Sequence, residues 1–370
     1  MTTDQQFQGS GNRLPAQPPP PTIRDAVVWA YRLLLGREPD DQAAVDVHLG
    51  HGSVASLRAA FMETPEFKQS CPATTAAAAA AVTADEAAVI DRFRPFFHGP
   101  APAGSWFDFL GVRTRCDFLP SGYDGLSPFA MQGSPGSASG PLHDKEEWVG
   151  TLRSVLEARN RLVVMELGAG WAPWLVGAAV AARRVGITDV RLIGVEGSAG
   201  HVRFMDQHLR DNGIDPGAHA LIHGVAGPAD GIARFPRLSD PRNDYGSQAE
   251  MAGSAPPGAA AADMEEVRCY SLETLFKDVD RVDLLHCDIQ GMEGAVFAAS
   301  RQVVNAKLRR AVIGTHSRAV EAELMATFSG EGWMLEDETA CRLHQAADGV
   351  FHLLADGCQV WRNPRLDPSA

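Results

Sequence analysis

The chain lacks the features that mark a protein for nucleic acid, for a membrane or for a disulfide framework. Its 46 acidic residues outnumber its 33 lysines and arginines, and the formal net charge is -13. A field of that sign repels nucleic acid and anionic membrane surfaces, so we expect neither as a partner. No apolar run approaches the roughly 18 to 20 residues of a transmembrane helix. The six cysteines include no CxxC pair, which disfavours both disulfides and a zinc site.

The start of the chain also lacks the basic and apolar regions of a secretory signal. Together with the dispersed cysteines, this favours a reducing, cytoplasmic location. The composition is that of an ordinary globular protein, with 45% hydrophobic and 21% charged residues. A length of 370 residues is enough for one large domain with smaller attachments.

Composition divides the chain into five stretches. A polar, proline-rich start predicts a disordered tail, and an alanine-rich stretch predicts a linker. An aromatic-rich stretch without clear periodicity predicts a segment that covers the main domain and contributes to substrate binding. The stretches are the tail at 1–22, a small helical module at 23–70, the linker at 71–88, the cover segment at 89–150 and the main domain at 151–365.

Two sets of apolar residues in the helical module have the spacing of one helix face. We expect Gly36 to end the first helix and Ser53 to cap the second. The two sets are Val27, Ala30, Tyr31 and Leu34, and Leu57, Ala60 and Phe61.

From about residue 160, short apolar runs alternate with helical stretches. This alternation predicts an α/β domain with a doubly wound, mostly parallel sheet covered by helices on both faces. A late hairpin that turns at Asp356 and Gly357 would add antiparallel edge strands. The expected strands are 162–167, 190–195, 220–225, 282–287 and 311–314, and the expected helices include 173–185 and 201–211.

The segment LVVMELGAGWAPW, residues 162–174, has the pattern of a buried strand, a glycine turn and a helix start. Gly168, Ala169 and Gly170 match part of a dinucleotide fingerprint, and Pro173 at the third glycine position suits the first turn of a helix. Alone this pattern is weak evidence for a cofactor site, because many βα turns need glycine for positive φ.

Glu166 discriminates between cofactors. A carboxylate opposes a pyrophosphate but attracts the ammonium and sulfonium of S-adenosyl-L-methionine, by about 4 kcal/mol at 4 Å before desolvation.

Glu196 ends the next expected strand, where a carboxylate can accept hydrogen bonds from both ribose hydroxyls. The alternative is a solvated charge at a strand end, and the occurrence of Glu166 and Glu196 together favours a cofactor pocket. The adenine would lie at the end of the third strand, although a tight turn explains that segment equally well. The further cofactor contacts that we expect are Gly197, Ser198, Val225 and Ala226.

VDLLHCDIQGMEGAVF places Asp288, Gln290 and Glu293 after another buried strand. Ligands in open α/β sheets bind at such carboxyl ends, although Asp288 serves equally well as a helix N-cap. His316 ends the fifth expected strand, and we expect His316 and Asp288 to be the catalytic residues, with His316 taking a proton from a hydroxyl. A divalent cation held by Asp288, Glu293 and His316 is the alternative. Since sequence does not show that the three converge, we expect no metal.

Residues 160–363 resemble the FkbM-type S-adenosylmethionine-dependent methyltransferases. The matching pieces are MELGAGWAPW, VEGSAGHVRFMDQHL, GVAG, YSLETL, VDLLHCDIQGMEGAV and VIGTHS. The resemblance implies a Rossmann-like fold of the class I methyltransferase type and an O-methyltransferase that acts on a sugar or a polyketide hydroxyl. It also implies cofactor binding by Glu166, Gly168, Gly170 and Glu196, with Asp288 and Gln290 lining the site.

The chain departs from that family at two of these positions. The family usually has Asp where Glu166 stands, which keeps the charge. It has Glu where Gln290 stands, and this loss of a carboxylate weakens the metal alternative.

Residues 25–70 are similar to a short helical domain of unknown function of the YRxLLGRxPD type, through AYRLLLGREPD and FMETPEF. That domain occurs in bacterial surface-associated and carbohydrate-handling proteins, which favours a glycan acceptor. Its simplest role is a docking or dimerisation bundle, so we expect a homo-oligomer or a docking partner through residues 23–70.

The leading hypothesis is a bacterial, cytoplasmic O-methyltransferase that acts on a sugar or glycan precursor. An NAD(P)-dependent Rossmann oxidoreductase is disfavoured by Glu166, by Pro173 and by the absence of a Tyr-x-x-x-Lys pair. A non-catalytic scaffold that keeps the fold stays open. We expect the loop at 241–265 to be mobile, although its Asn243, Asp244 and Tyr245 could contact substrate. The residues expected to shape the acceptor site are Trp106, Phe107, Asp108 and Arg113.

Overall fold

The computed structural model divides into two compact units, residues 1–80 and 81–370. The predicted tail at 1–22 lies outside the residues that the structure describes. The described residues are Arg24, Val27, Val28, Tyr31, 39–50, Leu57, Ala60, Phe61, 83–93, 100–120, 143–251, 263–346, Gly349 and 351–366.

The first unit contains helix α2 (Gln42–Asp46), whose N-cap Asp41 accepts a hydrogen bond from the backbone N–H of Ala44. Tyr31 and Phe61 meet edge to face with their ring centroids 4.9 Å apart. The core confirms two members of each predicted apolar set, while Ala30, Leu34, Gly36 and Ser53 lie outside the described residues. The buried side chains are Val27, Tyr31, Val45, Leu57 and Phe61.

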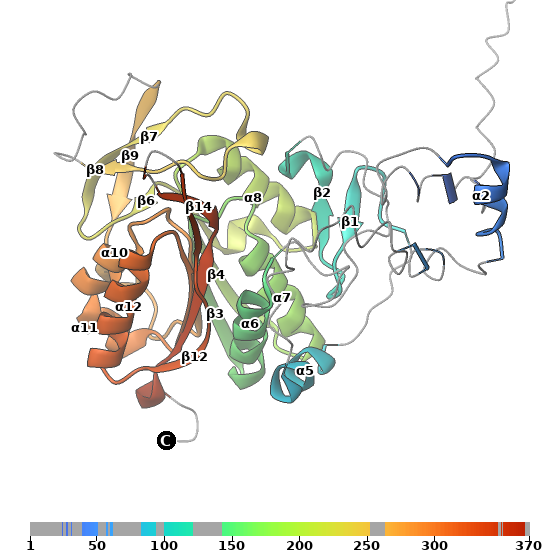
Figure 1. Ribbon diagram of the computed structural model, residues 1–370. Coiled ribbons are helices and arrows are strands. Elements are labelled where there is room, and N and C mark those ends of the chain that lie inside the picture. The colour runs from blue at the N-terminus through green and yellow to red at the C-terminus, as the bar shows by residue number, and fades with distance from the viewer. Residues whose placement is uncertain are drawn as a thin grey trace, which may run out of the picture. The chain divides into compact units, whose positions relative to one another are not determined.

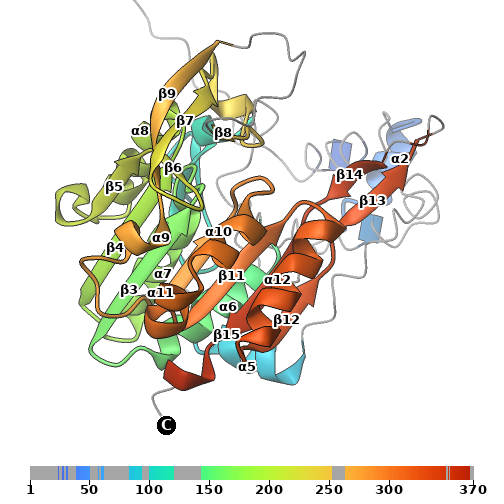
Figure 2. The ribbon, with the colours of Figure 1, turned by 90° about the vertical axis from the view of Figure 1, so that its left-hand side faces the viewer.

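The second unit is built on a seven-stranded sheet in the order β12-β15-β11-β10-β3-β4-β5 (Figures 1 and 2). All neighbouring pairs are parallel except those of β15, which is antiparallel to β11 and to β12. The doubly wound, mostly parallel α/β prediction is confirmed. The strands are β3 (Arg161–Leu167), β4 (Asp189–Glu196), β5 (Ala220–His223), β10 (Leu284–Cys287), β11 (Arg310–Thr315), β12 (Met334–Thr339) and β15 (Gly357–Arg362).

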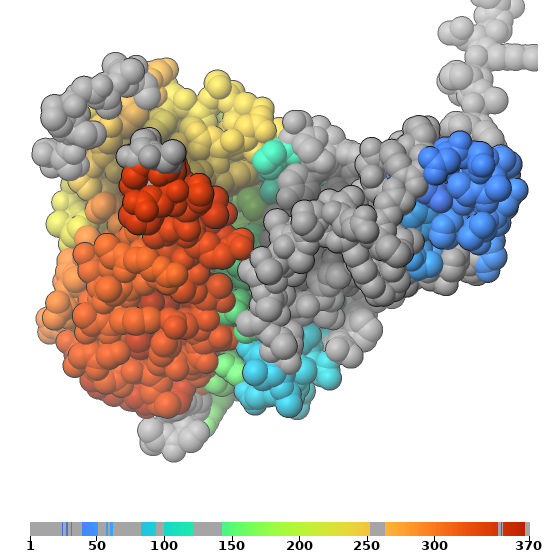
Figure 3. All heavy atoms as spheres, viewed as in Figure 1, coloured from blue at the N-terminus to red at the C-terminus, as the bar shows by residue number. Residues whose placement is uncertain are grey.

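Alternate side chains of each strand enter two separate cores, one on each face of the sheet. Val164 of β3 packs on one face and Met165 on the other. The first face is covered by α5 (Ala84–Asp91), α6 (Lys145–Glu157), α7 (Pro173–Arg184) and α8 (Ala199–Asp211). The second is covered by α9 (Leu272–Leu275), α10 (Glu293–Ala299), α11 (Arg301–Lys307) and α12 (Arg318–Gly330), and Figure 3 shows the outer surface of this second layer in orange.

Three smaller sheets and four short 3₁₀ helices complete the described part of the chain. The sheets are β1 (Ser105–Phe107) with β2 (Arg113–Arg115), β13 (Arg342–Gln345) with β14 (Phe351–Ala355), and a four-stranded sheet of β6 (Val225–Ala226), β9 (Met264–Tyr270), β7 (Gly231–Pro236) and β8 (Glu250–Met251). The 3₁₀ helices are Cys116–Phe118, Pro216–Ala218, Pro241–Asn243 and Pro364–Leu366.

The hairpin predicted at Asp356 and Gly357 is wrong, although β15, which follows this turn, does join the main sheet as an antiparallel strand. β14 pairs with β13 in a ribbon that extends beyond the main sheet (Figure 2), whereas β15 lies inside the sheet between β11 and β12. The reason is burial. Cys358, Val360 and Trp361 of β15 are almost fully buried, and a strand buried in this way needs partners on both edges.

Several predicted boundaries also differ from the observed elements. The third expected strand, 220–225, divides at Gly224 into β5 and β6, which belong to different sheets. Helix α5 begins inside the predicted linker, with a capping box between Thr83 and Glu86. Helix α6 runs across the predicted boundary at 150. Its Lys145 forms ion pairs with Glu86 of α5 at 2.7 Å and with Asp337 of β12 at 3.0 Å, which ties these elements to the main sheet.

The described cysteines Cys269, Cys287, Cys341 and Cys358 are free thiols, and all four are buried, as is Cys116. In the part of the chain that the structure describes, no helix has the length and apolar character needed to cross a membrane.

Candidate active site

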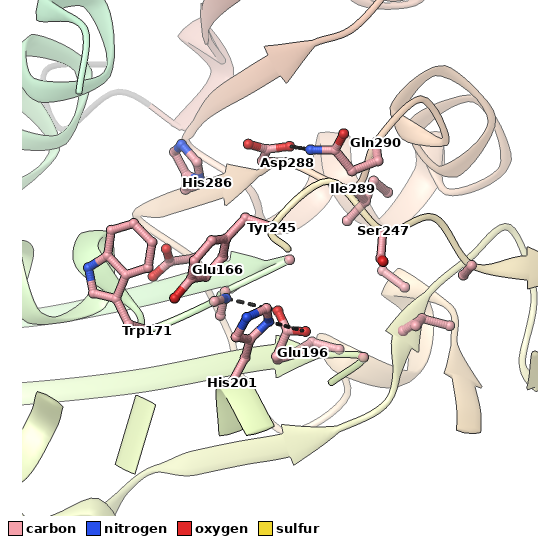
Figure 4. Close-up of a pocket in the computed structure, with 18 of the residues that line it drawn as sticks. Glu166, Trp171, Glu196, His201, Tyr245, Ser247, His286, Asp288, Ile289 and Gln290 are labelled. Atoms are coloured by element: carbon pink, nitrogen blue, oxygen red, sulfur yellow. Dashed lines mark hydrogen bonds and ion pairs between the residues drawn. The ribbon is translucent and has the colours of Figure 1, made fainter. Parts of the chain in front are cut away.

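A cavity of about 300 Å³ lies at the carboxyl ends of β3, β4 and β10 (Figure 4). The strand order reverses here, because β4 and β5 follow β3 in one direction while β10 and β11 extend the sheet in the other. Such a switch point is where open α/β sheets bind their ligands. The volume falls within the range of pockets for small molecules and cofactors.

The glycine turn between β3 and α7 forms one wall of the cavity. Gly168 and Gly170 have φ of +70° and +53°, and Ala172 adopts φ of 61° just before Pro173 begins α7, as predicted. The N–H groups of Gly168 and Ala169 donate to the carbonyl of Val195 at 3.0 and 3.1 Å, which attaches the turn to the end of β4. Glycine is required because the turn uses left-handed backbone at close approach to its neighbours.

Glu166 lies at the cavity, as predicted, but its carboxylate has a partner that the sequence pattern does not reveal. The side chain is 1% exposed, and Oε2 accepts a hydrogen bond from the N–H of Leu175 at 2.9 Å. Burial raises the pKa of Glu166 well above its usual range. Glu166 therefore ties β3 to the first turn of α7, and a cation in the cavity would favour its charged form.

Glu196 connects the glycine turn to the start of α8. Its two carboxylate oxygens accept the N–H groups of Gly170 at 2.8 Å and of Ser198 at 2.7 Å. Nδ1 of His201 lies 3.5 Å from Oε1, and the ring of Tyr245 stacks on His201 with centroids 4.3 Å apart. Each oxygen keeps a second lone pair, so Glu196 can also accept hydrogen bonds from a ligand.

The cavity gathers most of the residues expected to bind a cofactor. Ser198 is the exception, because its Oγ caps α8 by accepting the N–H of His201 at 3.3 Å. The expected residues that line the cavity are Glu166, Gly168, Ala169, Gly170, Glu196, Gly197, Val225, Ala226, Asp288 and Gln290.

Asp288 reaches the cavity from the end of β10. It is not a helix N-cap, because α10 begins at Glu293 with Met292 in the capping position. The Asp288 carboxylate lies 3.2 Å from Nε2 of His316 and accepts the side-chain N–H of Gln290 at 3.0 Å. Burial opposes its charge, but the His316 and Gln290 contacts outweigh burial and lower the pKa of Asp288.

His316 lies behind Asp288 and does not line the cavity. Its ring lies between Asp288 and Glu293, with Nδ1 3.3 Å from the Glu293 carboxylate. Burial works against the imidazolium, but the two carboxylates outweigh it and raise the pKa of His316 to about 10. A ring with that pKa is protonated at neutral pH, which counts against the predicted role of His316 as the base.

Several residues that line the cavity were not predicted. Nε2 of His286 lies 3.0 Å from Oε1 of Glu147, and the His286 ring stacks on Trp174 with centroids 4.9 Å apart. His286 pairs in register with Glu166 on the neighbouring strand, and paired residues share a face, but this register is visible only in the structure. The unpredicted polar and aromatic residues are His143, Glu147, Trp171, Trp174, His201, Phe235, Ser247 and His286.

The loop expected to be mobile contributes Asp244, Tyr245 and Ser247 to the cavity wall. The Tyr245 hydroxyl donates to the carbonyl of Phe118, and its ring meets Trp171 edge to face at 4.9 Å. This part of the loop is therefore packed in place, while residues 252–262 lie outside the described part.

The residues expected to shape the acceptor site do not line the cavity. Trp106 packs in a buried cluster beside Trp171. Asp108 accepts the N–H groups of Leu110 and Val112, both at 2.9 Å, and burial raises its pKa to about 7. The Arg113 side chain donates to Ser105 at 3.1 Å. These contacts give Trp106, Asp108 and Arg113 a structural role.

No family model matches the chain. A protein of Jannaschia sp. (strain CCS1) named "Putative methyltransferase" is 34% identical over 274 residues, which cover 73% of this chain and 96% of that protein. Among solved structures, precorrin-6y C5,15-methyltransferase from Geobacter metallireducens GS-15 is 14% identical with a TM-score of 0.33, over 60% of this chain and 89% of that one. TrmK of M. capricolum, solved with S-adenosyl-homocysteine, is 9% identical with a TM-score of 0.30, over 58% and 67%. TM-scores this low do not support an inference about function, whereas 34% identity over most of both chains indicates common descent.

Proposed function

The chain belongs to the methyltransferase family, and from this premise we propose that it binds S-adenosyl-L-methionine in the cavity at β3, β4 and β10. We propose further that it transfers the methyl group to a hydroxyl of a sugar or glycan precursor. The observation that carries the cofactor assignment is the charge of the cavity wall.

Five carboxyl groups line the cavity, of which Glu166 is the most easily neutralised because burial raises its pKa, and among the described residues no lysine or arginine lines the cavity. A pyrophosphate would meet repulsion here, whereas an ammonium and a sulfonium would be attracted. This supports S-adenosyl-L-methionine over a nicotinamide dinucleotide. The carboxylates are those of Glu147, Glu166, Glu196, Asp244 and Asp288.

The two ends of the cavity suit the two ends of this cofactor. Glu196 has free lone pairs for ribose hydroxyls, and the neighbouring wall contains the apolar side chains of Val225, Ala226 and Phe235, which suit an adenine. Glu147 and Glu166 lie on the side of His286 and Trp174, where they suit the ammonium of the methionine part.

When bound, S-adenosyl-L-methionine supplies an electrophilic methyl group on a sulfonium. Asp288 is the residue placed to act on the acceptor, because it lines the cavity and its lowered pKa keeps it charged at neutral pH. Its carboxylate would accept the proton that the acceptor hydroxyl loses when the methyl group leaves sulfur for the hydroxyl oxygen, so that the S–C bond breaks as the O–C bond forms. His316 is a positioning residue that orients Asp288 and sustains its charge.

The FkbM resemblance and the helical module at 23–70 support a glycan hydroxyl as the acceptor, and the module is proposed as the docking or dimerisation element.

Calorimetric titration with S-adenosyl-L-methionine and with NAD tests the cofactor assignment. The wild-type chain should bind the first, and Glu196→Ala should lose this binding. Asp189→Ala is the matched control, because Asp189 is exposed at the opposite end of the same strand. Binding of NAD alone would overturn the proposal.

Release of S-adenosyl-homocysteine in the presence of sugar nucleotides and glycan fragments tests the acceptor. Turnover that requires a free hydroxyl, and that stops when that hydroxyl is already methylated, supports O-methyl transfer. Turnover only with amine or carbon acceptors would overturn it.

A further inference from the structure

Three metal-ligating side chains converge behind the cavity. Asp288 follows β10, Glu293 begins α10 and His316 follows β11, and one ligand atom from each lies within 4.8 Å of the others. A further carboxylate approaches from the segment before β15, since Oδ1 of Asp356 lies 3.9 Å from Nε2 of His316. Four separate segments therefore bring carboxylates and an imidazole to one place.

The histidine at the centre of this cluster lacks hydrogen bonds. The His316 side chain is 8% exposed, and neither Nδ1 nor Nε2 has a hydrogen-bond partner. Carboxylate oxygens nonetheless lie 3.2 and 3.3 Å from the two nitrogens. A buried imidazole that faces carboxylates without hydrogen-bonding to them has the environment of a metal ligand.

The charge of the cluster also favours a cation. Asp288, Glu293 and Asp356 each form an ion pair with His316, and among the described residues no lysine or arginine pairs with any of the three. A cation would take the place of the His316 proton, because only the neutral imidazole ligates a metal, and the three carboxylates leave the cluster negative in either state.

The carboxylate ligands are held in place by neighbouring groups. Glu293 is fully buried, and its carboxylate accepts the N–H groups of Ile289 and Gly291, each at 3.0 Å. Gln290 fixes Asp288 from the other side, at 3.0 Å. Gly314 leaves room for the cluster, because a Cβ there would lie 3.3 Å from the Asp288 carboxyl carbon. Such outer contacts orient metal ligands.

We propose that Asp288, Glu293 and His316 bind a divalent cation, with Mn²⁺ as the best fit. Carboxylate oxygens suit Mg²⁺, Ca²⁺ and Mn²⁺, whereas imidazole suits transition metals. Mn²⁺ accepts both kinds of ligand. Because Asp288 belongs to the cluster and to the cavity wall, the cation would lie at the edge of the cavity, where it can lower the pKa of an acceptor hydroxyl. That catalytic role rests on the proposed function, whereas cation binding does not.

To test this, metals are removed from the full chain with a chelator, and the chain is then titrated with MnCl₂. Binding is measured as the loss of the electron paramagnetic resonance signal of free Mn²⁺. The wild type should bind one Mn²⁺ per chain, and His316→Gln and Asp288→Asn should each weaken binding at least tenfold. His352→Gln is the matched control, because His352 is exposed on β14. Asp288→Asn keeps the hydrogen bonds of Glu293 to the backbone, so this variant still tests the metal site if His316→Gln does not fold.

Absence of binding to the wild type, or equal binding by the wild type and both variants, would overturn the metal site. Titration of the same samples with S-adenosyl-L-methionine separates this outcome from failure of the proposed function. If the protein binds S-adenosyl-L-methionine but not Mn²⁺, only the metal-site proposal is wrong. If it binds Mn²⁺ but not S-adenosyl-L-methionine, only the proposed function is wrong.

Discussion

The backbone oxygen of Asp288 occupies the place where a side chain on Gly168 would begin. A Cβ on Gly168 would lie 1.8 Å from that oxygen, and Gly168 also has φ of +70°. Gly168 belongs to the turn after β3 and Asp288 to the end of β10, so the contact joins two walls of the cavity. The N–H of Asp288 donates to the carbonyl of Leu167 at 2.9 Å and reinforces this junction.

Gly168→Ala should therefore destabilise the protein by at least about 3 kcal/mol, because the backbone of Asp288 has to move. Gly186→Ala is the control. Gly186 has φ of +85° but open space around it, so its substitution should cost only about 1 kcal/mol for the backbone conformation. Urea denaturation of both variants measures the difference. Equal decreases in the free energy of unfolding would show that the close approach of Asp288 to Gly168 adds nothing to the cost of the substitution.

The sheet could be predicted from the sequence wherever the signal was local. β10 and most of β3 are buried on both faces, and such strands are continuous apolar runs that need no knowledge of their partners. The prediction for β15 failed because its signal was not local. Its apolar run at Cys358, Val360 and Trp361 is visible, but strand pairing depends on which distant segments have free edges. The turn residues Asp356 and Gly357 suggested that β15 pairs with the preceding strand, whereas β15 is buried between β11 and β12.

The candidate site shows the same division. Glu166, Glu196 and Asp288 were found because strand ends in a parallel sheet meet at one edge. Glu147 was missed and Tyr245 was assigned to a mobile loop because both come from stretches without periodicity, so only tertiary packing brings them to the cavity. The convergence of Glu293 and His316 on Asp288 was likewise invisible, since it depends on where α10 begins relative to β11.

Glu196→Gln should weaken binding of S-adenosyl-L-methionine by about ten- to a hundredfold. The carboxylate accepts the N–H groups of Gly170 and Ser198, and an amide presents a donor to one of them. Hydrogen bonds to a charged group are worth about 1.5–3 kcal/mol. Calorimetric titration measures the effect, and Asp189→Asn, at the other end of β4, should bind as the wild type does. Unchanged affinity in Glu196→Gln would show that the charge of Glu196 is unnecessary.

Tyr245→Ala should lower cofactor affinity at least tenfold, because the ring forms the cavity wall next to Gly170 and stacks on His201. Tyr245→Phe keeps the ring and loses only the hydrogen bond to Phe118. It should cost about 1 kcal/mol of stability and only a few-fold in affinity. Tyr270→Ala, outside the cavity, controls for the loss of a tyrosine ring. Equal affinities for the alanine and phenylalanine variants would contradict a role of the ring.

Acid should destabilise the protein through His208, which is fully buried beneath the glycine turn. Nδ1 lies 2.9 Å from the carbonyl of Trp171, so it carries the proton, and Nε2 lies 3.3 Å from the hydroxyl of Thr114. Burial lowers the pKa of His208 from 6.5 to about 4. Above pH 6.5 both the folded and the unfolded state are neutral at this residue. Between pH 6.5 and 4 only the unfolded state gains the proton, so the free energy of unfolding should fall by about 3 kcal/mol.

His208→Gln removes this titration, so the decrease in unfolding free energy between pH 6.5 and 4 should be smaller by about that amount. The variant should also be less stable than the wild type at pH 7, because it loses the packing of the ring against Phe118. Urea denaturation at several pH values gives both quantities, and His352→Gln, which removes an exposed histidine, serves as the control. Since His208 contacts Trp171 in the turn, cofactor affinity should fall over the same pH range in the wild type. Identical pH dependence in the wild type and His208→Gln would show that His208 is not the residue responsible.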